Sequence, residues 1–161
     1  MSTYVPEIVP SHIMVDLLKS EWDSREGNIP MPHIFEANMM PENPMEVSLS
    51  ISPAQDSALI VRPEPSGEKE TLRDLGAQLK DVTFWISIDM YTMKSRQRLY
   101  DMKAEIRRII HANMHSFQNE SGQGYQVAWY RGFQDFAQNT KNIWYGIIRV
   151  ECVNNKIAID V

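Results

Sequence analysis

The chain has a single cysteine, no long apolar run and no excess of basic residues. Each of these shortages excludes one or more classes of protein. Because Cys152 stands alone, an internal disulfide and a metal site built from several thiolates are both excluded. No apolar stretch approaches the roughly 20 residues that cross a bilayer, so we expect no association with a membrane. The opening segment MSTYVPEIVP has neither a basic start nor an apolar core, which argues against a secretory signal. These shortages predict a protein that folds in a reducing cytoplasm.

The charge balance is acidic, with 21 acidic residues against 16 basic ones and a formal net charge of −5. A nucleic-acid-binding protein normally presents a basic face that releases counterions from phosphates. The one local concentration of bases lies between Lys94 and Arg108, on a predicted helix that also carries Asp101 and Glu105. A solvated helix face explains this mixture better than a phosphate-binding surface does.

No group of residues has the spacing of a reaction centre. His111 and His115 lie four apart, on one side of a predicted helix, but no Glu follows His111 as a zincin helix requires. The run Ser121-Gly-Gln-Gly124 lacks the strand-to-helix setting of a phosphate-binding loop or a nucleophile elbow. Cys152 falls in a predicted strand, where a buried, unreactive thiol is expected. We therefore expect no enzyme activity, no cofactor and no metal.

The strongest structural signal lies between Val82 and Phe117. Apolar residues alternate with Thr83, Trp85, Ser87, Asp89 and Tyr91, the two-residue period of a strand with one buried face. From Ser95, which is placed to cap a helix, apolar residues recur at three- and four-residue steps as far as Phe117. This pattern predicts a helix over 95–117 that packs on the strand and is long enough to cross the whole sheet.

The remaining segments complete a single domain over 1–161. A first helix is expected after Pro10, with Ser11 as its cap. Residues 63–80 are polar and read as an extended loop, and residues 24–45 as an irregular arm. Strands are expected at 47–51, 57–62, 125–133 and 142–153, with residues 134–141 joining the last two. The order of helices and strands predicts an α+β two-layer sandwich, an antiparallel sheet packed on one face by the long helix and the N-terminal helix.

Several aromatic and methionine side chains are candidates for contacts between subunits. Trp85 and Tyr91 fall on the strand face that the long helix does not cover, and aromatic residues are enriched at interface centres. Methionines adapt to uneven surfaces, so the arm either packs on a neighbouring subunit or wraps its own domain. The candidates are Trp85, Tyr91, Met39, Met40, Trp129, Tyr130 and Trp144.

The succession from Val82 to Val153 resembles the tail-terminator and tail-completion (head–tail joining) proteins of long-tailed phages. The matching segments are VTFWISIDMY, RQRLYDMKAEIRRIIHANM, YQVAWYRGF and NIWYGIIRVECV, with SHIMVDLLKSEW as the N-terminal helix. The resemblance implies a structural virion protein that forms a ring, usually a hexamer. Such a ring caps the tail tube, joins it to the head connector or neck, and is assembled in the host cytoplasm. It implies no catalysis and no cofactor.

The acid excess agrees with a ring through which DNA passes without sequence-specific binding, since each basic contact to a phosphate would strengthen binding. Three other functions stay open at this point. One is a monomeric or dimeric α+β binding module with a small-molecule or peptide pocket. Another is a different neck or connector subunit. The third is an enzyme of unrecognised type that uses His111, His115 and a loop carboxylate.

Overall fold

The computed structural model describes residues 9–22, 29–36, 56–72, 79–119, 122, 124–140 and 143–157. The helices and strands within these ranges are α1 (Pro10–Glu21), β1 (His33–Glu36), β2 (Ser57–Leu72), β3 (Leu79–Thr92), α3 (Arg96–Ala112), β4 (Phe117–Gln118), β5 (Gly124–Tyr125), β6 (Val127–Thr140) and β7 (Ile143–Ile157). Met39, Met40 and the expected strand at 47–51 lie outside the described residues. Neither of these two helices is long and apolar enough to cross a membrane.

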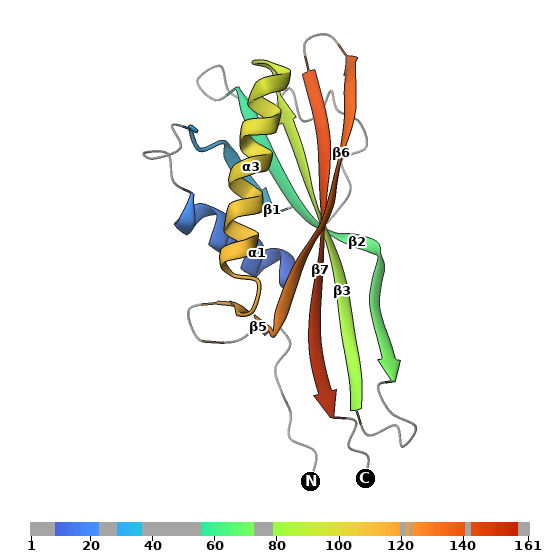
Figure 1. Ribbon diagram of the computed structural model, residues 1–161. Coiled ribbons are helices and arrows are strands. Elements are labelled where there is room, and N and C mark those ends of the chain that lie inside the picture. The colour runs from blue at the N-terminus through green and yellow to red at the C-terminus, as the bar shows by residue number, and fades with distance from the viewer. Residues whose placement is uncertain are drawn as a thin grey trace.

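Five strands form one twisted sheet in the order β1-β2-β3-β7-β6, and both helices pack on the same face of it (Figure 1). The predicted α+β fold is therefore confirmed. The sheet is mixed rather than wholly antiparallel, because β1 runs parallel to β2 with His33 beside Ala58. A parallel neighbour needs a connection of a dozen or more residues, and residues 37–56 provide that length. The prediction that the arm at 24–45 is irregular throughout is wrong at β1, which is too short to show a period.

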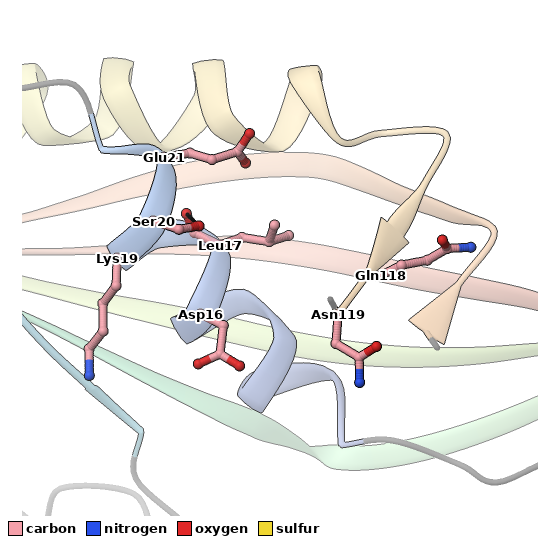
Figure 2. Close-up of a pocket in the computed structure, with 7 residues that line it drawn as sticks. All are labelled: Asp16, Leu17, Lys19, Ser20, Glu21, Gln118 and Asn119. Atoms are coloured by element: carbon pink, nitrogen blue, oxygen red, sulfur yellow. Dashed lines mark hydrogen bonds between the residues drawn. The ribbon is translucent and has the colours of Figure 1, made fainter. Parts of the chain in front are cut away.

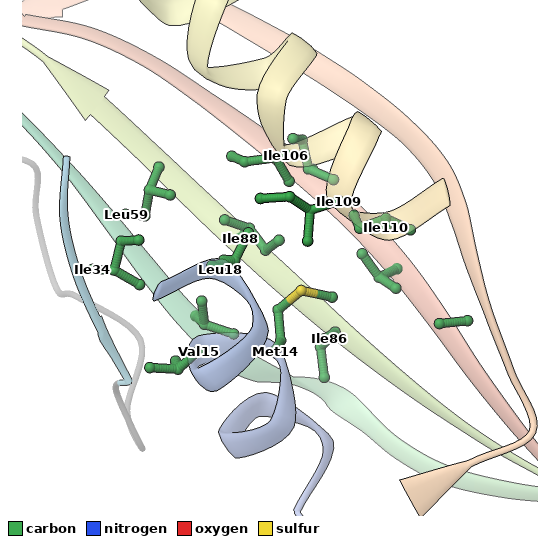
Figure 3. Packing of buried hydrophobic residues seen from close by; sticks show 14 of the residues in the cluster. Met14, Val15, Leu18, Ile34, Leu59, Ile86, Ile88, Ile106, Ile109 and Ile110 are labelled. Carbon is green, nitrogen blue, oxygen red and sulfur yellow. The ribbon is translucent and has the colours of Figure 1, made fainter. Parts of the chain in front are cut away.

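The main core lies between the helices and the sheet, as the helix and strand periods predict (Figure 3). Ser95 caps α3 as expected, and its Oγ accepts a hydrogen bond from the backbone N–H of Arg98 over 3.1 Å. The buried residues include Met14 and Leu18 from α1, Ile106, Ile109 and Ile110 from α3, and Ile86 and Ile88 from β3.

Both helix boundaries differ from the prediction at one end. Helix α1 begins at Pro10, where a missing N–H costs nothing, and its N-cap is Val9 without a side-chain bond. Ser11 is buried one residue further along, and its Oγ donates to Glu36 of β1 over 2.8 Å. Helix α3 ends at Ala112 rather than near residue 117, and the side-chain Nδ2 of its C-cap, Asn113, donates to the Ile109 carbonyl over 2.9 Å.

The polar segment at 63–80 is not a loop over most of its length. Strand β2 continues to Leu72 and β3 begins at Leu79, with a shift in register between Pro63 and Glu68. Beyond Val61, β2 has no outer partner among the described strands, so its prolines occupy an edge that tolerates them. Residues 134–140 likewise belong to β6 rather than to a connection.

The sheet is much longer than the helix layer. The 14 residues of β3 span about 46 Å at 3.3 Å per residue, whereas the 17 residues of α3 span about 26 Å. Figure 1 shows β2, β3 and β7 running on past both helices at one end of the molecule. The expectation that α3 crosses the whole sheet is therefore wrong.

Candidate interaction surface

The sheet has a second face, turned away from α1 and α3, which we call the outer face. The alternation along β3 places Trp85, Ser87, Asp89 and Tyr91 there, as the sequence predicts. Strand register extends these positions into rows, with Tyr91 beside Tyr145 at one end and Trp85 beside Glu151, which itself pairs with Trp129, at the other. No helix of the described part of the chain lies over this face.

One end of the outer face is closed by aromatic rings. Tyr91 stacks on Tyr145 at 4.7 Å and 15°, and Phe136 stacks on the same Tyr145 ring at 4.9 Å and 18°. Tyr91 is only 2% exposed and belongs to a small second core with Ala58, Ile60 and Ile143. Burial raises the pKa of Tyr145 to about 12, so its hydroxyl is neutral at physiological pH. Tyr91 therefore packs inside this small core, and its side chain is not exposed for contact with a neighbouring subunit.

A buried ion pair lies beside this stack. The Nε of Arg62 donates to Oδ2 of Asp89 over 2.9 Å, and the two side chains are 6% and 1% exposed. The other carboxylate oxygen of Asp89 has no hydrogen-bond partner among the described residues. Burial raises the pKa of Asp89, and the hydrogen bond and charge of Arg62 oppose that rise without cancelling it. This pair joins β2 to β3 on the outer face.

The other end of the outer face is polar and partly exposed. Arg149 donates from Nε and Nη2 to the two carboxylate oxygens of Glu64 over 2.7 and 2.9 Å, and its guanidinium lies 4.7 Å from the centre of the Trp85 ring. The Arg149 hydrogen bond lowers the pKa of Glu64, whose Oε1 also accepts from Ser87. Arg149 is thus held between Glu64 and Trp85, and Glu64 is held between Arg149 and Ser87.

The same arrangement recurs on β6. Arg131 donates from Nε to Glu151 over 3.2 Å, and its guanidinium lies 5.5 Å from the centre of the Trp129 ring. Arginine fixed by a carboxylate and stacked on tryptophan loses little side-chain freedom on binding. Tryptophan and arginine are also the residue types that carry most binding energy at protein interfaces. We call Trp85, Trp129, Arg131 and Arg149, with Glu64 and Glu151, the tryptophan–arginine surface.

Sequence reasoning nominated the two tryptophans of this surface but missed its charged residues. The sequence does contain a signal for these charged residues. Arg149 and Glu151 interrupt an apolar strand at alternate positions, and Arg131 follows Trp129 by two residues, so each pair shares one face of its strand. The nominated Tyr130 and Trp144 point to the helix side, where they pack partly buried against the main core.

The open alternative of an enzyme depended on His111, His115 and a loop carboxylate. No group of three or more His, Cys, Asp or Glu side chains there lies close enough to hold a metal ion. His111 and His115 are exposed at the end of α3, and the ring of His111 contacts the edge of Tyr130 at 6.1 Å. Cys152 is buried on the helix side, and burial raises the pKa of its thiol.

Two hollows formed by described residues bear on ligand binding. A small one of about 210 Å³ lies on the outer face beside Arg149 and the β6 irregularity at Gly132, below the usual size of a ligand pocket. A larger one of about 790 Å³ lies beside α1 (Figure 2) and is open and polar. It is lined by Asp16, Leu17, Lys19, Ser20, Glu21, Gln118 and Asn119. This lining holds no nucleophile beside a base.

No protein-family model matches this chain, and no curated protein matches it in sequence.

Proposed function

We propose that this chain is a ring-forming structural subunit of a phage tail or neck, in the position of a tail terminator. The observation that carries the proposal is the tryptophan–arginine surface on a sheet that extends beyond its helices. Partly exposed tryptophans stacked under fixed arginines are suited to binding another protein. A neighbouring protein is the occupant that the chemistry of this open sheet face fits.

The edge strand β6 makes the surface accessible to a neighbour. Its residues alternate, so Trp129 and Arg131 lie on the outer face while Tyr130 and Phe133 lie under α3. A protein docked over the β6 edge touches both sets at once. In a ring, each copy uses two different surfaces, and the rotation that relates one copy to the next must return to the starting copy. The β1 and β6 edges of this sheet differ in length and composition, so they are candidates for these two surfaces.

Sedimentation velocity and negative-stain microscopy of the purified chain test the proposal. We expect annular particles whose population grows with protein concentration. A chain that stays monomeric at high concentration contradicts the ring.

The paired variant Trp85→Ala/Trp129→Ala tests the surface itself. Tryptophans that act as interface hot spots contribute about 2 kcal/mol or more each, so removing both is expected to raise the dissociation constant of the assembly about a thousandfold. Met93→Ala is the matched control, because Met93 is an exposed apolar side chain outside this surface. Rings that form equally well without both tryptophans would show that the outer face is not a contact between copies.

A further inference from the structure

The charges of this chain are segregated along the sequence. Between Lys94 and Arg108 there are six Lys and Arg residues and two acids, whereas the rest of the chain has ten bases and nineteen acids. The structure places Arg96, Lys103 and Arg107 of this segment on one side of α3. Arg98 is instead buried, where it donates to Ser57 and to the carbonyl of Pro30. Arg108 lies against Glu105 and the carbonyl of Glu21. An acidic protein with a basic patch on one side has an asymmetric charge distribution, and this asymmetry favours some relative orientations of two copies over others.

The basic side is a stripe along α3 that overhangs β6. Arg96, Tyr100, Lys103, Arg107 and His111 follow one another at steps of three and four residues, so they share one side of the helix. We call this stripe, with the β6 side chains beneath it, the basic flank.

Aromatic rings of β6, rather than carboxylates, support most of the basic flank. Lys103 lies 5.0 Å from the centres of the Tyr100 and Phe133 rings, and Arg107 lies 5.4 Å from the centre of Tyr130. Neither cation forms an ion pair within the described residues. Arg96 does pair, with Asp135 over 2.8 Å. The two unpaired cations are therefore held in position with their charge uncompensated.

The opposite side of the helix layer is acidic. Helix α1 lies mainly over β1 and β2, the edge of the sheet opposite β6, and it also contacts α3 and β5 (Figure 1). Asp16, with a side chain 57% exposed, and Glu21 both border the hollow in Figure 2, and Glu36 lies on neighbouring β1. The carbonyl of Glu21 at the end of α1 accepts a hydrogen bond from Arg108, whose charge is balanced by Glu105. The Glu21 carboxylate accepts from the side-chain amide of Asn113.

This acidic flank is not uniformly acidic. It also contains Lys19, which borders the hollow, and His12, which lies 3.6 Å from Asp16 and 3.2 Å from Glu36. With histidine neutral, the three carboxylates exceed the one lysine by two charges. The basic flank exceeds its one carboxylate, Asp135, by the same amount.

We propose that copies of this chain associate head to tail, with the basic flank of one copy against the acidic flank of the next. The inference rests on the proposed ring and names the contact that closes it. Continuous strand pairing between copies is disfavoured, because β6 is irregular at three places and β1 has only four residues. Side chains rather than backbone pairing must therefore provide the match, and opposite charges near opposite edges give every copy the same polarity.

Charge reversal of one flank at a time tests the pairing. Lys103→Glu/Arg107→Glu makes both flanks acidic, and Asp16→Lys/Glu21→Lys makes both basic. Each variant alone is expected to assemble at least about tenfold more weakly than the natural chain, measured by sedimentation velocity. An equimolar mixture is expected to recover assembly, since the acidic flanks of the first variant meet the basic flanks of the second.

The mixture also serves as the control for folding, because a variant that fails to fold cannot rescue its partner. Lys94→Glu is the control for a change of charge outside the stripe. Raising the salt concentration is expected to weaken the natural assembly, since the screening length falls from about 8 Å at 0.15 M to about 3 Å at 1 M.

The outcomes separate this inference from the ring itself. A natural chain that never assembles overturns both. Rings that tolerate the reversals overturn only the flank pairing. Variants that are folded by circular dichroism but fail to assemble, both alone and together, do the same. Binding of duplex DNA at near-physiological salt that is lost in Lys103→Glu/Arg107→Glu would identify the stripe as a phosphate-binding surface and overturn the pairing as well.

Discussion

Replacing Arg62 with methionine tests whether the outer face depends on its buried ion pair. The Nε of Arg62 lies 2.9 Å from Oδ2 of Asp89, and both side chains are almost fully buried. Methionine retains the apolar stem of arginine but not its charge, so the Asp89 carboxylate is left buried without a cation. Removing one partner of such a pair destabilises a protein by about 3–5 kcal/mol. We expect Arg62→Met to lower the free energy of unfolding by that amount.

Removing both partners is expected to be far less harmful. A buried ion pair replaced by apolar residues of similar volume is often neutral or more stable, so Arg62→Met/Asp89→Leu should recover most of the loss. Urea unfolding followed by tryptophan fluorescence measures both variants, and Asp89→Leu completes the double-mutant cycle. The reasoning is refuted if Arg62→Met stays within about 1 kcal/mol of the natural chain, or if the double variant is no more stable than Arg62→Met.

The loss is also expected to depend on pH. Burial raises the pKa of Asp89, and Arg62 opposes that rise, so the pKa rises further when Arg62 is removed. An acid whose pKa is higher in the folded state stabilises the fold at low pH and loses that contribution as the pH rises through the folded pKa. The destabilisation in Arg62→Met should therefore shrink as the pH falls below the raised pKa of Asp89 towards its ordinary value. In the Asp89→Leu background it should stay constant.

Three further predictions concern the scaffold. Ser95→Ala removes the N-cap bond of α3 and should cost about 1 kcal/mol in thermal unfolding, and no change would mean that water replaces the cap. Gly146→Ala places a Cβ 2.6 Å from the Phe133 ring and should cost about 1–3 kcal/mol, part of which Phe133→Leu should relieve; equal loss in both would point to backbone strain instead. Because burial raises its thiol pKa, Cys152 should resist a thiol reagent in the folded protein and react once it is unfolded. Rapid reaction in the folded state would place the thiol nearer the surface.

The parts of the fold that lie against the core could be predicted from the sequence. Strand β3 and helix α3 each bury one side, and one-sided burial imposes the alternation and the helical period that the sequence shows. The same alternation correctly separated Trp85 and Tyr91 from the helix side. The alternation could not show that Trp85 is partly exposed whereas Tyr91 is buried, because exposure depends on which strands and loops lie nearby.

Segments that extend past the helix layer carried no such signal. Beyond Pro63, β2 has no helix against it, so no apolar residues are needed at alternate positions and the segment reads as a loop. Hydrogen bonding to β3 extends it as a strand, and that partner lies far away in sequence. The short parallel strand β1 escaped prediction for a different reason, because its four residues are too few to show a period.

Composition and period thus determined the two-layer architecture, the burial of β3 and α3, the capping role of Ser95 and the concentration of bases on one helix. Tertiary structure alone decided that Arg149 meets Glu64 and Trp85, that Arg62 is buried with Asp89, and that basic and acidic flanks occupy opposite edges. The physical reason is distance along the chain. A periodic pattern shows on which face of its own helix or strand each side chain lies. A contact between two elements depends on strand register and packing, which the sequence of one segment does not contain.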